Sequence, residues 1–172
     1  ELPVPAMDLA RNRKGFVGNI RSLLATELRG ATLILWASFF LCFIALYFLF
    51  SWIPRLMEQT GYSVESGRQA FFLFNVGAVI GIFLLGALST RWRLSNLVFV
   101  FLLSSAVGMV VFATVPNQLT VLMVVIFLVG ALLQGGFVGL YAVAGKVYPT
   151  EVRSTGIGWA IGLGRLGAVV GP

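Results

Sequence analysis

Long apolar runs dominate this chain, and they limit it to folds that are embedded in a membrane. Each run is about twenty residues long, the length that an α-helix needs to cross the hydrocarbon layer. Hydrophobic residues make up 59% of the chain and charged residues only 10%, with a mean hydropathy of +0.97. A soluble domain of this size carries roughly a quarter charged residues. We therefore predict an all-α integral membrane protein.

The apolar runs predict about five transmembrane helices. They cover residues 31–53, 69–89, 94–115, 119–147 and 156–172. The first is expected to end at Pro54-Arg55, because proline lacks the N–H that a continuing helix needs, and residues 56–67 would then form a polar connection. Residues 1–30 precede the membrane domain of residues 31–172. There we predict a cytoplasmic loop followed by a short amphipathic helix over residues 16–28.

Both ends of the chain look cut. The first residues have neither an initiator methionine nor the basic-then-apolar pattern of a signal peptide. The last apolar run stops at Pro172 and is interrupted only by Arg165. We therefore expect the chain to be a fragment of a longer protein.

Lysine and arginine are distributed unequally over the two ends of the predicted spans. About nine lie on the N-terminal side and about two, Arg55 and Arg68, on the other, and cytoplasmic loops typically carry such an excess. The nine are Arg11, Arg13, Lys14, Arg21, Arg29, Arg91, Arg93, Lys146 and Arg153. We predict a multi-pass protein of the plasma membrane (the bacterial inner membrane), with its N-terminal segment in the cytoplasm. Because these charges follow the span ends, they favour contact with the lipid bilayer over nucleic-acid binding.

The predicted spans lack the groups that enzymes use for acid–base or nucleophilic chemistry. The chain has no histidine, and no aspartate or glutamate lies within a span. The single cysteine, Cys42, lies among apolar residues, where a reactive thiolate is not favoured. We expect no enzymatic activity, no catalytic residue, no metal and no cofactor. A non-transporting multispan membrane subunit stays an alternative.

Arg165 interrupts the last apolar run. It lies about eight residues into that run, which places it roughly 12 Å deep at 1.5 Å per residue. An arginine at such depth costs at least about 2.5–3.5 kcal/mol, so its side chain should face a cavity or a partner. The planar guanidinium suits two-point binding of a carboxylate. The alternative is a structural bond to backbone carbonyls or to an acid elsewhere in the protein.

Aromatic and polar side chains in other spans are further candidate substrate contacts. Phe40, Phe43 and Tyr47 share one face of the first span, where an aromatic solute would stack; anchoring in lipid is the alternative. Asn75 in the second span, and Gln134 and Tyr141 in the fourth, would hydrogen-bond a solute or a neighbouring helix. Gln134 and Tyr141 share one helix face.

Glycine pairs with the GxxxG spacing occur in three of the spans. This spacing lets helices approach closely in lipid. The pairs are Gly77 and Gly81, Gly135 and Gly139, Gly158 and Gly162, and Gly167 and Gly171.

Three segments resemble the major facilitator superfamily. Residues 148–156, YPTEVRSTG, look like the loop that joins its tenth and eleventh membrane helices. Residues 86–93, GALSTRWR, resemble its short loop between paired helices, with Thr90 in place of the usual aspartate. Residues 164–172, GRLGAVVGP, are most similar to the aromatic acid:proton symporter family, with the organic-ion transporters next.

The resemblance implies a truncated C-terminal half of a carrier, with helices seven to eleven present. The N-terminal half and the twelfth helix of the same protein would be its partners, and any proton-coupling residues would lie in that missing half. Helices seven and ten line the substrate cavity in this superfamily. Carriers of this kind contain inverted three-helix repeats, so the first three spans would repeat from the fourth onward.

The function implied is secondary active transport, with proton-coupled uptake of aromatic or other organic carboxylates by alternating access. The ligands would be a small organic anion and a proton. Another organic-ion carrier or a sugar-like carrier of the superfamily is the alternative. The candidate substrate contacts are Arg165, Tyr141, Gln134, Phe40, Phe43, Tyr47 and Asn75, and the candidate loop-motif residues are Arg91, Arg93, Glu151 and Arg153.

Overall fold

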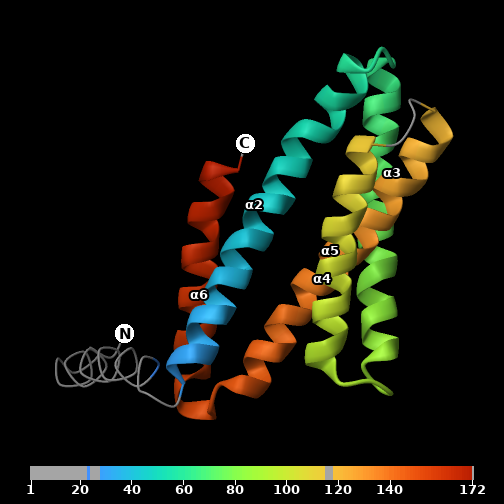
Figure 1. Ribbon diagram of the computed structural model, residues 1–172. Coiled ribbons are helices and arrows are strands. Elements are labelled where there is room, and N and C mark those ends of the chain that lie inside the picture. The colour runs from blue at the N-terminus through green and yellow to red at the C-terminus, as the bar shows by residue number, and fades with distance from the viewer. Residues whose placement is uncertain (1–22, 24–27, 115–117, 172) are drawn as a thin grey trace, which may run out of the picture.

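The computed structural model describes Leu23 and residues 28–114 and 118–171. These residues form the helices α2 (Arg29–Gln59), α3 (Val64–Leu88), α4 (Leu94–Thr114), α5 (Leu119–Val147) and α6 (Thr150–Val170), and this part of the chain contains no strand. Each helix runs antiparallel to the one before it (Figure 1). The all-α prediction is confirmed. The amphipathic helix predicted over residues 16–28 lies almost entirely outside the described residues.

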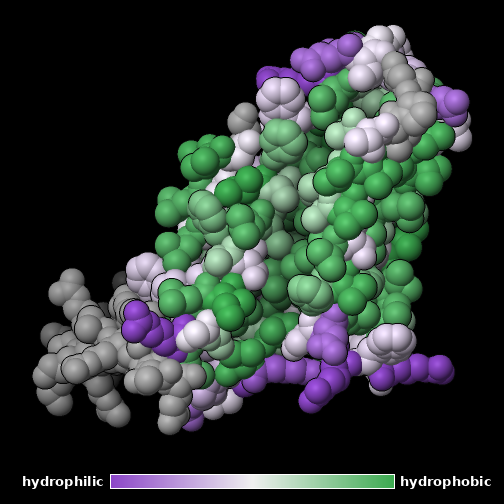
Figure 2. Space-filling model, in the orientation of Figure 1, coloured by the Kyte–Doolittle hydropathy of each residue, from purple (hydrophilic) through white to green (hydrophobic). Residues whose placement is uncertain are grey.

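The face of the bundle in Figure 2 is apolar over its middle and polar at its two ends. Helices α2 to α5 are each long and apolar enough to cross a membrane. Large apolar side chains such as Phe83 and Val169, which are 75% and 81% exposed, point outward from the bundle. Exposure of this kind is stable only when lipid takes the place of water around the helices.

The prediction that the first span ends at Pro54 is wrong for the helix itself. α2 continues through Pro54 to Gln59, and the side chains of Ile53 and Met57 stay buried across the proline. Transmembrane helices tolerate proline because neighbouring helices support the interrupted turn. Here α3 supplies that neighbour, since a Cβ on Gly67 would lie only 3.2 Å from the Pro54 carbonyl oxygen.

The polar connection predicted over residues 56–67 is accordingly much shorter. Only residues 60–63 separate α2 from α3. Gly61 has a φ of +89°, a left-handed conformation that glycine adopts without strain, and it ends α2. Ser63 begins α3, because its hydroxyl accepts a hydrogen bond from the Ser66 N–H at 3.2 Å.

The turn predicted over residues 148–156 is also mostly helical. α6 begins at Thr150, so that only Tyr148 and Pro149 connect it to α5. Its buried residues already follow a four-residue spacing at Val152, Gly156 and Ala160. Of the charges that indicated a loop, Glu151 is exposed in the first turn of α6 and Arg153 is partly buried.

Helices α3 and α5 touch through glycine. A Cβ on Gly77 or Gly81 of α3 would collide with the backbone carbonyl oxygen of Phe127 or Ala131 of α5. Gly135 of α5 likewise lies against the Gly81 carbonyl oxygen. Backbones this close gain dispersion contacts that larger residues would prevent, which is the main source of helix association in lipid.

Helices α2 and α6 repeat this contact. A Cβ on Gly167 of α6 would lie 2.6 Å from the Phe40 carbonyl oxygen, and one on Gly171 would lie 2.9 Å from that of Ile44. As in the α3–α5 pair, the two helices run in the same direction and the glycines meet carbonyls four residues apart. The α2/α6 pair thus has the same kind of contact as the α5/α3 pair, with α2 in the place of α5 and α6 in the place of α3. The two pairs run in opposite directions (Figure 1), as expected for an inverted repeat.

One glycine pair makes no close helix contact among the described residues. Gly158 and Gly162 of α6 have no neighbouring heavy atom within 4 Å of a Cβ position among the described residues. They lie on the face of α6 that points away from α2, because the buried side of the helix carries Val152, Gly156 and Ala160.

Candidate functional site

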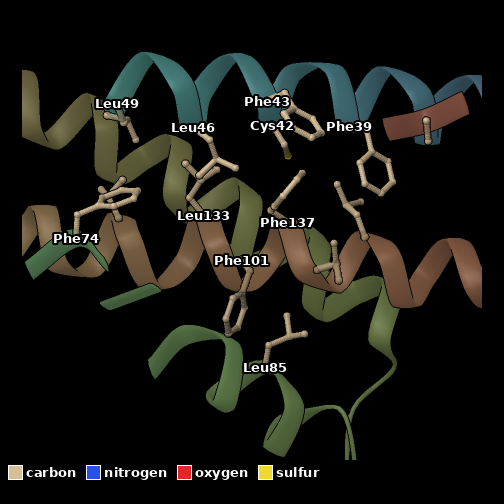
Figure 3. Close-up of a cluster of buried hydrophobic side chains, with 14 of the residues drawn as sticks. Phe39, Cys42, Phe43, Leu46, Leu49, Phe74, Leu85, Phe101, Leu133 and Phe137 are labelled. Carbon is tan, nitrogen blue, oxygen red and sulfur yellow. The ribbon is translucent and has the colours of Figure 1, made fainter. Parts of the chain in front are cut away.

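Five aromatic side chains of α2 and α5 pack together near the middle of the bundle. We call this set the aromatic cluster, and it consists of Phe39, Phe43, Tyr47, Phe137 and Tyr141. Figure 3 shows Phe39 and Phe43 pointing from α2 toward α5, with Phe137 pointing back toward them. The Phe43 and Phe137 rings meet edge-to-face at 5.1 Å, and those of Phe39 and Tyr141 at 4.9 Å.

Edge-to-face packing fixes the orientation of these rings, since the positive edge of one ring meets the negative face of the next. Each such pair contributes about 0.5–1.5 kcal/mol beyond the area that it buries. Phe137 also meets Phe39 at 5.9 Å and Tyr141 at 5.5 Å, which places it at the centre of the cluster. Phe43 and Tyr47 are stacked at 6.2 Å, and Tyr47 is 42% exposed. The cluster therefore has a buried base and an open edge.

Arg165 of α6 directly follows Gly164, which lies against the Phe43 ring of the aromatic cluster. The side chain of Arg165 is exposed. Among the described residues the only ion pair joins Arg68 to Glu65, so Arg165 has no acidic partner there. A cation in an apolar helix without a counter-ion is costly, which makes an anion beside Arg165 favourable.

Gln134 lies on α5, one turn before Phe137. Its side-chain oxygen Oε1 is buried and has no hydrogen-bond partner among the described residues. An unsatisfied buried oxygen costs about 1–3 kcal/mol, so a donor from a solute or from another part of the protein is expected to meet it.

Two of the predicted substrate contacts lie apart from these residues. Phe40 points toward α6, where a Cβ on Gly167 would lie 3.2 Å from its ring. Asn75 of α3 donates from Nδ2 to the Phe71 carbonyl oxygen at 2.8 Å, a bond within its own helix. The structure therefore brings together Arg165, Tyr141, Phe43 and Tyr47, with Gln134 on the same helix as Tyr141.

The predicted loop-motif residues lie at the basic end of the bundle. Arg91 and Arg93 are exposed in the turn between α3 and α4, and Glu151 is exposed in the first turn of α6. Arg153 donates from Nε to the Tyr148 carbonyl oxygen at 3.2 Å. Because Tyr148 ends α5, this cation lies where the partial negative charge of the helix C-terminus favours it.

Sequence reasoning missed three features of this region. Phe39 and Phe137 complete the aromatic cluster, although the sequence contains no signal that separates them from lipid-facing rings. Trp36 of α2 packs against Trp159 of α6 with ring centroids 6.2 Å apart. Gly164, directly before Arg165, lies against the Phe43 ring. Each depends on contacts between helices that are distant in the sequence.

Two hollows of the described bundle lie elsewhere, between α2 and α4. A cavity of about 230 Å³ and a second of about 290 Å³ follow one another there and share Met109. Small residues of α2 and α4, including Ala45 and Ala106, line the second cavity, and Leu133 of α5 contributes to its wall. This α2–α4 groove contains no residue of the aromatic cluster.

Helices of membrane length, with close glycine contacts in two helix pairs, define a polytopic membrane protein. Beside its aromatic cluster lies an arginine that has no acidic partner among the described residues. Residues 3–172 match the family described as the Major Facilitator Superfamily. The chain belongs to this superfamily, whose members are transporters and not enzymes. No solved structure matches the chain.

Several curated relatives transport aromatic acids. The chain is 35% identical to the benzoate transport protein of Acinetobacter baylyi over 83% of its own length and 30% of the relative. It is 33% identical to the 3-(3-hydroxy-phenyl)propionate transporter of Escherichia coli over 89% of its length and 38% of the relative. It is 32% identical to the 4-hydroxybenzoate transporter of A. baylyi over 94% of its length and 35% of the relative. The chain thus spans about a third of the relatives it matches.

Proposed function

We propose that this chain is part of a secondary transporter that takes up aromatic carboxylates together with protons by alternating access. The place of Arg165 carries this proposal, because this exposed cationic residue directly follows Gly164, which lies against the Phe43 ring of the aromatic cluster. An aromatic carboxylate has the matching two parts. Its carboxylate would pair with the guanidinium, and its ring would pack against Tyr47 and Tyr141. The names of the relatives support the same substrate class.

Uptake by cells that express the complete carrier tests this proposal. Labelled benzoate should enter saturably, unlabelled 4-hydroxybenzoate should compete, and a protonophore should abolish the accumulation because it removes the driving gradient. The same cells without the carrier are the control. Competition by a hexose but not by aromatic acids would instead support the alternative, a sugar-like carrier. Accumulation that survives the protonophore would contradict proton coupling.

We also propose that the basic end of the bundle faces the cytoplasm of a bacterial inner membrane. Arg29, Arg91, Arg93, Lys146 and Arg153 belong to this end, and the other end carries Arg55 and Arg68 together with Glu58 and Glu65. The excess of positive charge at one end supports this orientation.

Cysteine labelling with a membrane-impermeant reagent measures the orientation. In a Cys42→Ala background, Glu58→Cys should react in intact cells, and Arg93→Cys only in inside-out vesicles. Both positions are exposed, at opposite ends of the bundle, whereas Cys42 itself is buried. The unsubstituted Cys42→Ala protein gives the background. Labelling of Arg93→Cys in intact cells would reverse the orientation.

The partners proposed for this chain are the remaining helices of the same carrier. The inverted repeat supports one of them in particular. α4 packs against α5 through Gly136 and Gly139, where added Cβ atoms would meet Leu102 and Val98. The repeat relates α5 to α2, so a further helix is expected on α2 at the corresponding place.

A further inference from the structure

At Gly164 the backbone of α6 lies directly against the Phe43 ring of the aromatic cluster. A Cβ at this position would overlap the edge of the Phe43 ring and would lie 2.7 Å from its Cε2 atom. Phe43 is only 9% exposed, so it has little free space into which to turn. Any side chain at position 164 therefore displaces this ring.

The neighbours of Phe43 decide where the displaced ring goes. α6 blocks one side, while Phe137 lies 5.1 Å away and Tyr47 lies 6.2 Å away. A ring that moves away from α6 presses on Phe137, which in turn contacts Tyr141 at 5.5 Å. Close packing transmits such a displacement, because the side chains already fill their space.

Gly164 also precedes Arg165 directly in α6. The close approach of α6 to Phe43 at Gly164 thus helps to set how far the Arg165 charge stands from Tyr141. Gly164 thus contacts Phe43 of the aromatic cluster and helps to set the position of the Arg165 guanidinium.

We propose that Gly164 is a specificity-determining residue, which sets the size of the aromatic ring system that fits between the cluster and Arg165. It acts by positioning Phe43 and does not itself bind the solute. This assignment rests on the proposed transport of aromatic carboxylates. A larger side chain at position 164 is therefore expected to narrow the space between the aromatic cluster and Arg165, and a smaller side chain at position 43 is expected to widen it.

Competition for benzoate uptake by the complete carrier measures the size of the site. The probes are 4-hydroxybenzoate, with a single ring, and 2-naphthoate, with two fused rings. Gly164→Ala is expected to weaken inhibition by 2-naphthoate about tenfold more than inhibition by 4-hydroxybenzoate, as overpacking by one methyl group would. Adding Phe43→Leu to Gly164→Ala should restore the original ratio, because it removes ring atoms where the methyl group was added.

Gly162→Ala is the matched control, since it makes the same chemical change in the same helix, and no heavy atom of the described residues lies within 4 Å of the new Cβ. Its inhibition ratio should stay unchanged. If Gly164→Ala does not accumulate, Phe43→Leu alone still tests the proposal, because it should strengthen inhibition by 2-naphthoate relative to 4-hydroxybenzoate. Equal ratios in Gly164→Ala and Gly162→Ala, or no change in Phe43→Leu, would overturn the assignment. Absence of benzoate uptake by the unmodified carrier would instead remove the proposed function, and with it this assignment.

Discussion

Arg165→Lys is expected to lose aromatic-acid uptake nearly as completely as Arg165→Ala. A lysine ammonium keeps the charge but offers no planar fork, so it cannot bind both oxygens of a carboxylate at once. The lost charge-assisted hydrogen bond is worth roughly 1.5–3 kcal/mol, or about 10–150-fold in apparent affinity. Initial uptake rates over a range of benzoate concentrations, normalised to the amount of carrier in the membrane, measure the effect.

A purely structural role for Arg165 predicts a different pattern. In that case Arg165→Ala would fold poorly, and Arg165→Lys would accumulate and transport almost normally. The substrate-binding role predicts normal accumulation of both variants, because removing an unpaired charge from a membrane helix eases its insertion. Arg68→Lys is the matched control, since Arg68 is an exposed arginine that pairs with Glu65 at the end of the bundle. Unchanged affinity in Arg165→Ala would end the substrate-binding role.

Gly81→Ala should destabilise the complete carrier more than any other single-methyl change that we consider. The new Cβ would overlap the Ala131 carbonyl group and would lie 2.6 Å from the Ala131 Cα. Backbone atoms cannot turn aside as a side chain can, so α3 and α5 must separate along their whole contact. Overpacking of this kind costs about 1–3 kcal/mol or more. The midpoint of thermal aggregation of the purified protein in detergent should fall measurably.

Gly86→Ala provides the comparison for this prediction. Gly86 lies in the same helix, yet within the described part of the chain no heavy atom comes within 4 Å of a Cβ there. Alanine is the better helix former by about 1 kcal/mol, so this variant should be as stable as the parent protein or slightly more stable. Equal losses in the two variants would show that glycine in α3 acts through helix flexibility and not through the contact with α5.

The sequence alone was sufficient to predict the membrane-spanning helices. Apolar runs of bilayer length have no stable alternative in lipid, because every backbone polar group must be bonded within its own segment. The bounds of α5 agree with the predicted run over residues 119–147. The helical conformation at Arg165, and the place of three of the four glycine pairs at helix contacts, followed from the same kind of argument.

Helix ends were harder to predict, since they depend on neighbours. Pro54 is a stop signal in isolation, but α2 continues because Ile53 and Met57 remain buried and Gly67 of α3 packs against the proline. The charged residues after Tyr148 indicated a loop for the same local reason. In α6 the buried residues at a four-residue spacing begin at Val152, so the helix starts at Thr150.

The candidate site was decided by tertiary structure. Periodicity shows which residues share a face of one helix, but not which helix that face meets. Phe40 was grouped with Phe43 by spacing, yet the approach of α6 at Gly167 draws Phe40 out of the cluster, while Phe137 and Phe39 enter it from positions that no local pattern distinguishes. The contact between Gly164 and Phe43 joins residues more than a hundred positions apart. The packing of α6 on α2 brings Arg165 close to the aromatic cluster. That packing depends on several glycines of α6 together, so the sequence around Arg165 alone could not predict it.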